Sequence, residues 1–396
     1  IGVLIDEGGS EAPPLDGAAA DVQAKGVYLR NCFNPVVRGN VIRNLMVVST
    51  TIIVTTEGIY FEIQSSGAVA PYITDTLDIS GNEVMWDSSA GDEFGIYIQA
   101  QDGTTAQPHT IASAKIEGNT VFEAGQAGVA LIVLNRGNIF NPNISDNIIK
   151  NCCGGAPILL QQASILVQAV NTVATNTGNL AGFKISGNRI QNSSQSGVLV
   201  YVDRECETNN LLVSDNHISE SANAGLEFAA TINCLLGGLS RVEVRGNTVQ
   251  DSTGANIVFG VSGAAGTPAA DLHSITVSGN TINSTGAGTG VTLNATTGTL
   301  KDIHVEGNSF RGDGTMVSGV TMTQTPAGLG SENIQISNNL VNATAAQAIF
   351  LDFTSKVSGL TINGNSLLSS ATGAIHVVCG HDMESLGISS NVIHKV

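Results

Sequence analysis

The sequence has little charge, few aromatic residues and no long hydrophobic run. Only 12% of its 396 residues are charged and only 4% are aromatic. Lys and Arg number 16 against 33 Asp and Glu, the formal net charge is −17, and the basic residues form no run. Electrostatic binding to nucleic acid is therefore not expected. No uninterrupted apolar stretch reaches about 18 residues, so no membrane-spanning helix is predicted.

Motifs for metal or nucleophile chemistry are missing too. The seven His residues show no metal-ligand spacing, and no Gly-x-Ser-x-Gly motif occurs. Six Cys residues are too few for a dense disulfide framework in a chain of this length. We predict no cofactor, with a calcium ion as the open alternative. The chain starts at Ile1 and stops at Val396 part-way through a repeat, so we expect a fragment of a longer protein.

Glycine is abundant, and so is one short repeated phrase. The chain has 46 Gly. A four-residue phrase also recurs twelve times, about 32 residues apart: its first residue is apolar, its second is variable, its third is usually Gly or Asp, and its fourth is Asn. A short strand ending at Asn is indicated in each copy, because Asn tolerates the left-handed backbone of a sharp bend. Stacked copies would let the Asn amides bond as a ladder. The twelve residues are Asn40, Asn82, Asn119, Asn147, Asn188, Asn216, Asn247, Asn280, Asn308, Asn339, Asn365 and Asn391.

A second phrase precedes most Asn phrases and consists of Gly or Ala followed by alternating residues. It begins at Gly26, Gly58, Gly95, Gly128, Gly197, Gly225, Gly290, Gly319 and Ala374. Three short strands per repeat cannot bury an apolar face alone, but stacked coils can. We predict an all-β, right-handed parallel β-helix of about 12 coils over residues 26–396, with residues 1–25 as a partial coil or cap. A meander of hairpins would require tight turns every 8–12 residues, which the long period disfavours.

This strand–Gly-Asn–strand repeat, as in Ile79-Ser80-Gly81-Asn82, resembles that of the pectate-lyase-like superfamily over residues 26–396. The resemblance implies a polysaccharide partner, and it is strongest to the body of bacteriophage tailspike depolymerases. That would imply a glycoside hydrolase or polysaccharide lyase, a homotrimer, and an extracellular or virion-associated location. The alternative is a non-catalytic carbohydrate-binding or structural surface protein. The catalytic motifs of pectate lyases and polygalacturonases are not matched, so none of their residues is carried over.

Enzymes of this superfamily usually work on the outer face of the strand that precedes the Asn phrase. On that face the third positions of successive coils read Tyr28, Tyr60 and Tyr97, an aromatic ladder that suits sugar rings or simply stabilises the sheet. The fifth positions read Arg30, Glu62 and Gln99, with Gln64 and Gln101 in the seventh. We take the polar residues beside the tyrosines as substrate-binding candidates, and Arg30 or Tyr60 as the acid–base group of a lyase.

Asp6 supplies a second carboxylate if residues 2–6 form a partial coil. Asp6 and Glu62 would then flank Arg30 at roughly 10 Å, near the separation of an inverting glycosidase. The loop from Trp86 to Phe94, with Asp92 and Glu93, could overhang the same face. An ordinary surface charge ladder is the simpler interpretation.

A second candidate lies further along the chain. Tyr201 and Asp203 end one strand and Glu227 lies on the next coil, which places the two carboxylates roughly 13 Å apart. Between the two candidates the outer face is apolar, so a covering segment (43–57 or 163–182) or a trimer contact is expected there. The patch comprises Ile132, Leu134, Ile158, Leu160 and Leu199. Cys206 and Cys234 fall in register on adjacent coils, within disulfide range or as a reduced pair.

Overall fold

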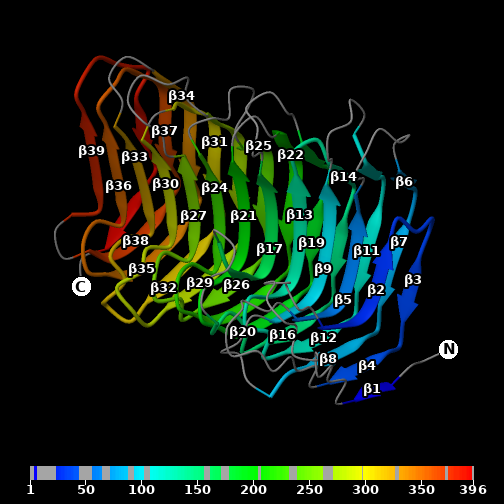
Figure 1. The fold of residues 1–396 in the computed structure, drawn as a ribbon. Coiled ribbons are helices and arrows are strands. Elements are labelled where there is room, and N and C mark those ends of the chain that lie inside the picture. The colour runs from blue at the N-terminus through cyan, green and yellow to red at the C-terminus, as the bar shows by residue number, and fades with distance from the viewer. Residues whose placement is uncertain are drawn as a thin grey trace, which may run out of the picture.

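The computed structural model describes residues 4–6, 24–43, 56–64, 72–87, 93–101, 108–155, 161–170, 178–203, 207–231, 239–261, 271–296, 298–325, 330–370 and 373–394. In these ranges the chain winds into stacked coils (Figure 1), and every regular element is a β-strand. Each strand pairs in parallel with its equivalents in the coils above and below, which forms three sheets. The predicted all-β solenoid is confirmed. None of the described elements is a helix that could span a membrane.

The 12-stranded sheet holds the Gly-initiated phrases and carries the candidate site. Alternate side chains point inward, so Ile59 and Phe61 are buried in the coil interior while the residues between them face outward. Its strands are β2 (Ala24–Arg30), β5 (Thr56–Ile63), β9 (Glu93–Gln101), β13 (Ala127–Leu134), β17 (Ala163–Val170), β21 (Ser196–Asp203), β24 (Leu226–Ala230), β27 (Ile257–Val261), β30 (Val291–Ala295), β33 (Val320–Gln324), β36 (Ile349–Phe353) and β39 (Ile375–Cys379).

The 17-stranded sheet ends at the Asn phrases, and in the later coils two short strands merge into one. It comprises β3 (Val36–Arg38), β6 (Ile73–Thr74), β7 (Leu77–Ser80), β10 (Thr110–Ile111), β11 (Ala114–Glu117), β14 (Asn138–Phe140), β15 (Asn143–Ser145), β18 (Asn179–Ala181), β19 (Lys184–Ser186), β22 (Glu207–Ser214), β25 (Leu239–Arg245), β28 (Leu272–Ser278), β31 (Leu300–Glu306), β34 (Ser331–Ser337), β37 (Val357–Asn363), β40 (Met383–Glu384) and β41 (Gly387–Ser389).

The 13-stranded sheet follows the Asn bend. It comprises β1 (Leu4–Asp6), β4 (Val41–Arg43), β8 (Glu83–Met85), β12 (Thr120–Phe122), β16 (Ile148–Lys150), β20 (Arg189–Ser193), β23 (His217–Ser221), β26 (Thr248–Gln250), β29 (Thr281–Ser284), β32 (Ser309–Gly312), β35 (Leu340–Thr344), β38 (Ser366–Ser370) and β42 (Val392–His394). Most of residues 1–25 lie outside the described ranges, so a separate cap there stays a prediction.

The asparagine ladder is confirmed at all twelve predicted positions. Each side-chain amide donates to the Oδ1 of the next ladder Asn at 2.9–3.0 Å, from Asn40 through to Asn391. The left-handed backbone, however, belongs to the residue before each ladder Asn, with φ between 56° and 66°. This explains the preference for Gly there, because Gly adopts positive φ without steric cost.

One coil is wound differently from the prediction. Residues 163–182 do not form an insert, because β17 takes up Ala163–Val170 and pairs with both β13 and β21. Leu166 therefore occupies the outward column that the sequence assigns to Ile158. Ile158 and Leu160 lie outside the described residues, as do Cys206, Cys234 and residues 44–55.

Candidate functional site

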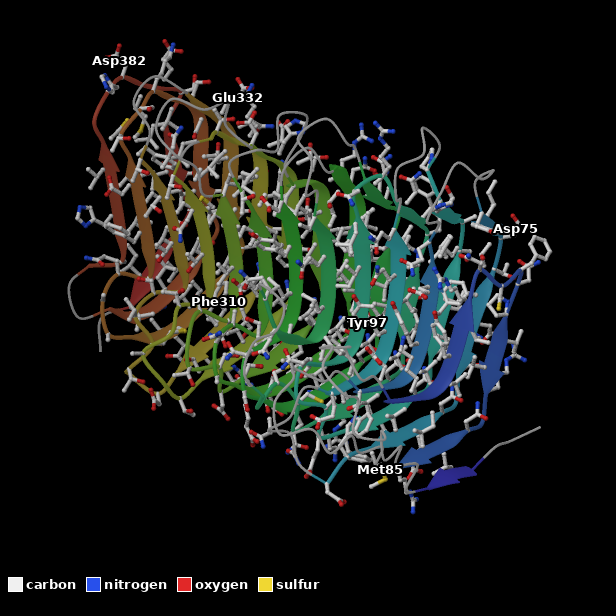
Figure 2. The ribbon with its side chains drawn as sticks, in the orientation of Figure 1. Asp75, Met85, Tyr97, Phe310, Glu332 and Asp382 are labelled. Carbon is white, nitrogen blue, oxygen red and sulfur yellow. The ribbon has the colours of Figure 1, made fainter. Side chains whose placement is uncertain are left out.

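The register of the first three coils places the predicted residues side by side. Tyr28 pairs with Tyr60, and Tyr60 with Tyr97, on β2, β5 and β9. Two positions along, Arg30 pairs with Glu62, and Glu62 with Gln99. Both predicted columns are therefore confirmed as neighbours on the outer face of the 12-stranded sheet, where Tyr97 is labelled in Figure 2.

The tyrosines are in contact but are not evenly exposed. The rings of Tyr28 and Tyr60 stack with centroids 5.4 Å apart, and Tyr60 meets Tyr97 edge to face at 5.1 Å. Tyr28 is 44% exposed and Tyr60 only 8%, while Tyr97 is half-buried beside Phe94. The aromatic ladder is thus present, but only its first ring presents much of its surface to solvent.

Glu62 is the centre of a buried polar network. Its carboxylate accepts hydrogen bonds from the hydroxyl of Tyr28 and from that of Tyr60 at 2.8 Å. The guanidinium of Arg30 lies 3.4 Å from the same carboxylate. Glu62 itself is only 4% exposed, so these three partners replace the water that a buried charge would lose. The Glu62 carboxylate thus accepts hydrogen bonds and orients the side chains of Tyr28, Tyr60 and Arg30.

Two charged residues that the sequence analysis missed complete the network. Lys25 pairs with Glu57 across β2 and β5, one position before the glycines that open these strands. The Lys25 ammonium lies 4.1 Å from the ring centre of Tyr28 and 3.9 Å from that of Tyr60, a cation–π arrangement. Burial lowers the pKa of Lys25, against the opposing effect of Glu57 and Glu62. The sequence could have indicated this pair, because Lys25 and Glu57 each come directly before the Gly that opens the aligned phrase.

Two glutamines extend the network along the third coil, and a third follows β5 in the second coil. The hydroxyl of Tyr97 donates to Gln99 at 2.9 Å, and Gln99 donates in turn to Gln101. The backbone of Gln64 exchanges two hydrogen bonds with the side chain of Asn31, at 2.9 and 3.0 Å. The side chains of Gln99 and Gln101 therefore continue the network, whereas Gln64 takes part only through its backbone.

The predicted contribution of Asp6 is wrong in its placement. β1 pairs with β4, so Asp6 lies opposite Arg43 in the 13-stranded sheet and not beside Arg30. Trp86 does not overhang the outer face either, because it is 6% exposed and packs in the coil interior. Glu93 opens β9 opposite Thr56, and Asp92 lies outside the described residues.

The second candidate does not form a carboxylate pair. Leu199 pairs with Glu227, which leaves Asp203 four positions further along the strand, as predicted. Asp203 accepts a hydrogen bond from Thr231, and Glu227 accepts one from Ser196. Each carboxylate has its own partner, and Tyr201 between them is buried. Among the described residues, no group of three or more His, Cys, Asp and Glu is arranged to hold a metal ion.

Part of the apolar stretch between the two candidates is buried within one chain. Ile132 is 2% exposed and Leu199 is 1% exposed, in a cluster separate from the coil interior. Ile132 and Leu199 are therefore removed from water, whereas Leu134 is half-buried and Ile158 and Leu160 lie outside the described residues. The covering segment and the trimer contact stay predictions.

We expect the titration of Tyr28 to report the network directly. Burial, followed by its hydrogen bond to Glu62, raises the pKa of Tyr28 to about 12. This pKa lies above the ordinary value of about 10, so the neutral phenol stabilises the fold fully below about pH 10. The stabilisation is lost as the pH rises from about 10 towards 12. The measurement is phenolate absorbance during a pH titration, in which Glu62→Gln should lower the pKa of Tyr28. The Tyr28→Phe variant identifies the Tyr28 transition, because that transition is missing from its titration. Identical titrations in wild type and Glu62→Gln would contradict the network.

Comparisons with known proteins agree with this architecture. Residues 235–393 match the family model described as "Right handed beta helix region". The chain is a right-handed parallel β-helix. No curated protein sequence matches the β-helix significantly.

Solved structures resemble the β-helix only distantly. The surface adhesin PfbA of Streptococcus pneumoniae is 10% identical, with 90% of this chain and 91% of that chain covered and a TM-score of 0.43. An α-1,3-glucanase catalytic unit from Streptomyces thermodiastaticus is 11% identical over 85% of this chain and 64% of that chain, with a TM-score of 0.45. Endopolygalacturonase I from Stereum purpureum is 12% identical over 85% of this chain and 95% of that chain, with a TM-score of 0.36. Similarities this distant carry no argument about function.

Proposed function

We propose that the β-helix binds a polysaccharide on the outer face of its first coils. The observation that carries this proposal is the pairing of two accessible groups, Tyr28 and Arg30, whose side chains are 44% and 45% exposed. Both are held from below by the buried carboxylate of Glu62. An aromatic face next to a fork of guanidinium donors suits a sugar ring and its hydroxyl or carboxylate groups. Preorganisation by Glu62 reduces the entropy lost on binding.

Binding is better supported than hydrolysis by a carboxylate pair. Such a reaction needs a second carboxylate across the sugar from Glu62, and Asp6 lies on another sheet. Glu62 is itself occupied by two phenols and a guanidinium. A depolymerase of the hydrolase type therefore has less support than the sequence suggested, and an extracellular or virion-associated location stays a prediction.

Uronate lyase or epimerase chemistry is the second candidate function. The observation that favours it is the Tyr28 hydroxyl next to Arg30, which could neutralise a substrate carboxylate. With its pKa raised to about 12, the Tyr28 phenol would serve as a proton donor at neutral pH. Tyr28→Phe would abolish unsaturated-uronate absorbance while retaining binding if this candidate is right.

The test is a binding panel of bacterial and plant polysaccharides, followed by affinity electrophoresis. We expect Tyr28→Ala to weaken binding about tenfold, as for a truncated aromatic anchor. Phe33→Ala is the matched control, because Phe33 is a 70% exposed aromatic residue outside the network. Polysaccharide binding that Tyr28→Ala leaves unchanged, or no binding across the panel, would refute the proposal.

A further inference from the structure

A second bend is stacked along the 17-stranded sheet. One residue per coil adopts a left-handed backbone there, in nine successive coils and with φ between 47° and 73°. The strand registers place these residues in one column. The column reads Asn141, Gly182, Asn210, Arg241, Ser274, Asp302, Asn333, Gly359 and Ser385. Figure 1 shows β22, β25, β31, β34 and β37 in sequence along this part of the molecule.

Arg241 is the exception in the column. The other eight residues are Asn, Gly, Ser or Asp, which are small or hydrogen-bond locally in this conformation. A long side chain on a left-handed backbone is disfavoured, and such outliers occur most often where function requires them. Arg241 is also exposed. The local backbone therefore gives no reason for arginine at this position.

A groove of about 400 Å³ opens at the same place. Asn210, Arg241 and Ser274 line it from the column, and Leu212, Glu243 and Thr276 line it two positions further along the same strands. It thus crosses three coils, about 10 Å along the stack. In the described part of the chain Arg241 forms no ion pair, whereas Glu243 lies 3.3 Å from the guanidinium of Arg245. Among the described residues, therefore, no carboxylate is paired with Arg241, and the Glu243 carboxylate that shares the groove is paired with Arg245.

Hydrolysis by a nucleophilic triad does not fit the groove. Ser274, His273 and Asp302 are the right residue types, and Asp302 lies 3.0 Å from Nε2 of His273. The Ser274 hydroxyl, however, lies 3.3 Å from one ring nitrogen of His273 and 3.4 Å from the other. It is therefore off the in-plane direction of either lone pair, and the imidazole cannot accept its proton well. The geometry suits binding.

We propose that this groove binds a uronate unit of an acidic polysaccharide through the Arg241 guanidinium. A guanidinium holds a carboxylate with two parallel hydrogen bonds, and the Asn210 amide and Ser274 hydroxyl suit the sugar hydroxyls. The apolar Leu212 offers a surface for the C–H face of the ring. The inference rests on the proposed function for the class of ligand, but it concerns a different sheet from the Tyr28 site.

The test is calorimetric titration of the folded protein with trigalacturonate and trimannuronate, with maltotriose as the neutral sugar. We expect at least one uronate trimer to bind, and Arg241→Asn to weaken it at least about tenfold. Asn tolerates the left-handed backbone, so this variant keeps the fold and should not lower the unfolding midpoint. Arg189→Asn removes an exposed guanidinium from the 13-stranded sheet, away from the groove, and should change affinity by less than about twofold.

Three outcomes overturn the proposal: no binding of either uronate trimer, equal binding by Arg241→Asn, or equal affinity for maltotriose. Failure of this inference is distinguishable from failure of the proposed function. If a long polysaccharide binds in a Tyr28-dependent way and Arg241→Asn does not change uronate-trimer binding, the Tyr28 site is supported and the groove proposal is refuted. Arg241-dependent trimer binding without Tyr28-dependent binding would do the reverse.

Discussion

Gly95→Ala should destabilise the protein by more than about 3 kcal/mol or prevent its folding. A β-carbon at Gly95 would lie 2.4 Å from the carbonyl oxygen of Gly128 and 2.4 Å from a methyl carbon of Val121. Both distances are well below contact, and the Gly128 oxygen belongs to the backbone of the next coil. The coils would have to separate locally, which breaks backbone hydrogen bonds between β9 and β13.

The measurement is the urea midpoint of unfolding, followed by far-ultraviolet circular dichroism. Gly260→Ala is the matched control, because a β-carbon there meets nothing within 4 Å and Gly260 also lies within a strand of the same sheet. It should be neutral or stabilising by roughly 0.5 kcal/mol, through the unfolded state. Equal midpoints for the two variants would show that the coils absorb the added carbon, contrary to our expectation.

Asn216→Ala should cost about 3–5 kcal/mol, because it interrupts the middle of the ladder. The Asn216 amide donates to Asn247 and to the carbonyl of Ile185, at 2.9 and 3.0 Å. Its Oδ1 accepts from the backbone and the side chain of Asn188, at 3.0 and 2.9 Å. Removal leaves buried donors and acceptors unpaired on both sides, and water cannot reach them.

Hydrogen exchange is the sharper measurement for this variant. Because each coil contacts only its neighbours, amides in the two coils beside Asn216 should lose protection more than those far along the stack. Asn223→Ala is the control, since Asn223 is exposed and bonds only at the surface. A uniform loss of protection along the whole chain would argue for global rather than local coupling.

The sequence was sufficient for the coil and for the position of its Asn bend, but not for the second bend along the 17-stranded sheet. The twelve ladder Asn residues are all where the repeated phrase places them, and Tyr28, Tyr60 and Tyr97 fall in one column because each strand starts from an aligned Gly. Period-2 alternation fixes which side chains face inward within each strand. The coil placed wrongly has Ser164 in place of this Gly, whereas Ala156, two residues before Ile158, matches the start of the phrase. This is why β17 was taken for an insert.

The candidate site was only partly predictable. Glu62 and Arg30 were found from the columns, but their partners Lys25 and Glu57 lie beyond the alternating phrase, next to the bend. Asp6 was assigned to the wrong sheet, because a three-residue strand carries too little pattern to select among three parallel sheets.

The sequence by itself determined the repeat, the ladder and the inward face, because these depend on backbone preferences and side-chain alternation that recur in every coil. Only the tertiary structure decided that Glu62 is enclosed by two phenols and a guanidinium, that part of the apolar outer face is buried, and that Arg241 lies over a groove. These features arise from contacts between residues on different coils and sheets. A pattern read along one strand does not contain them.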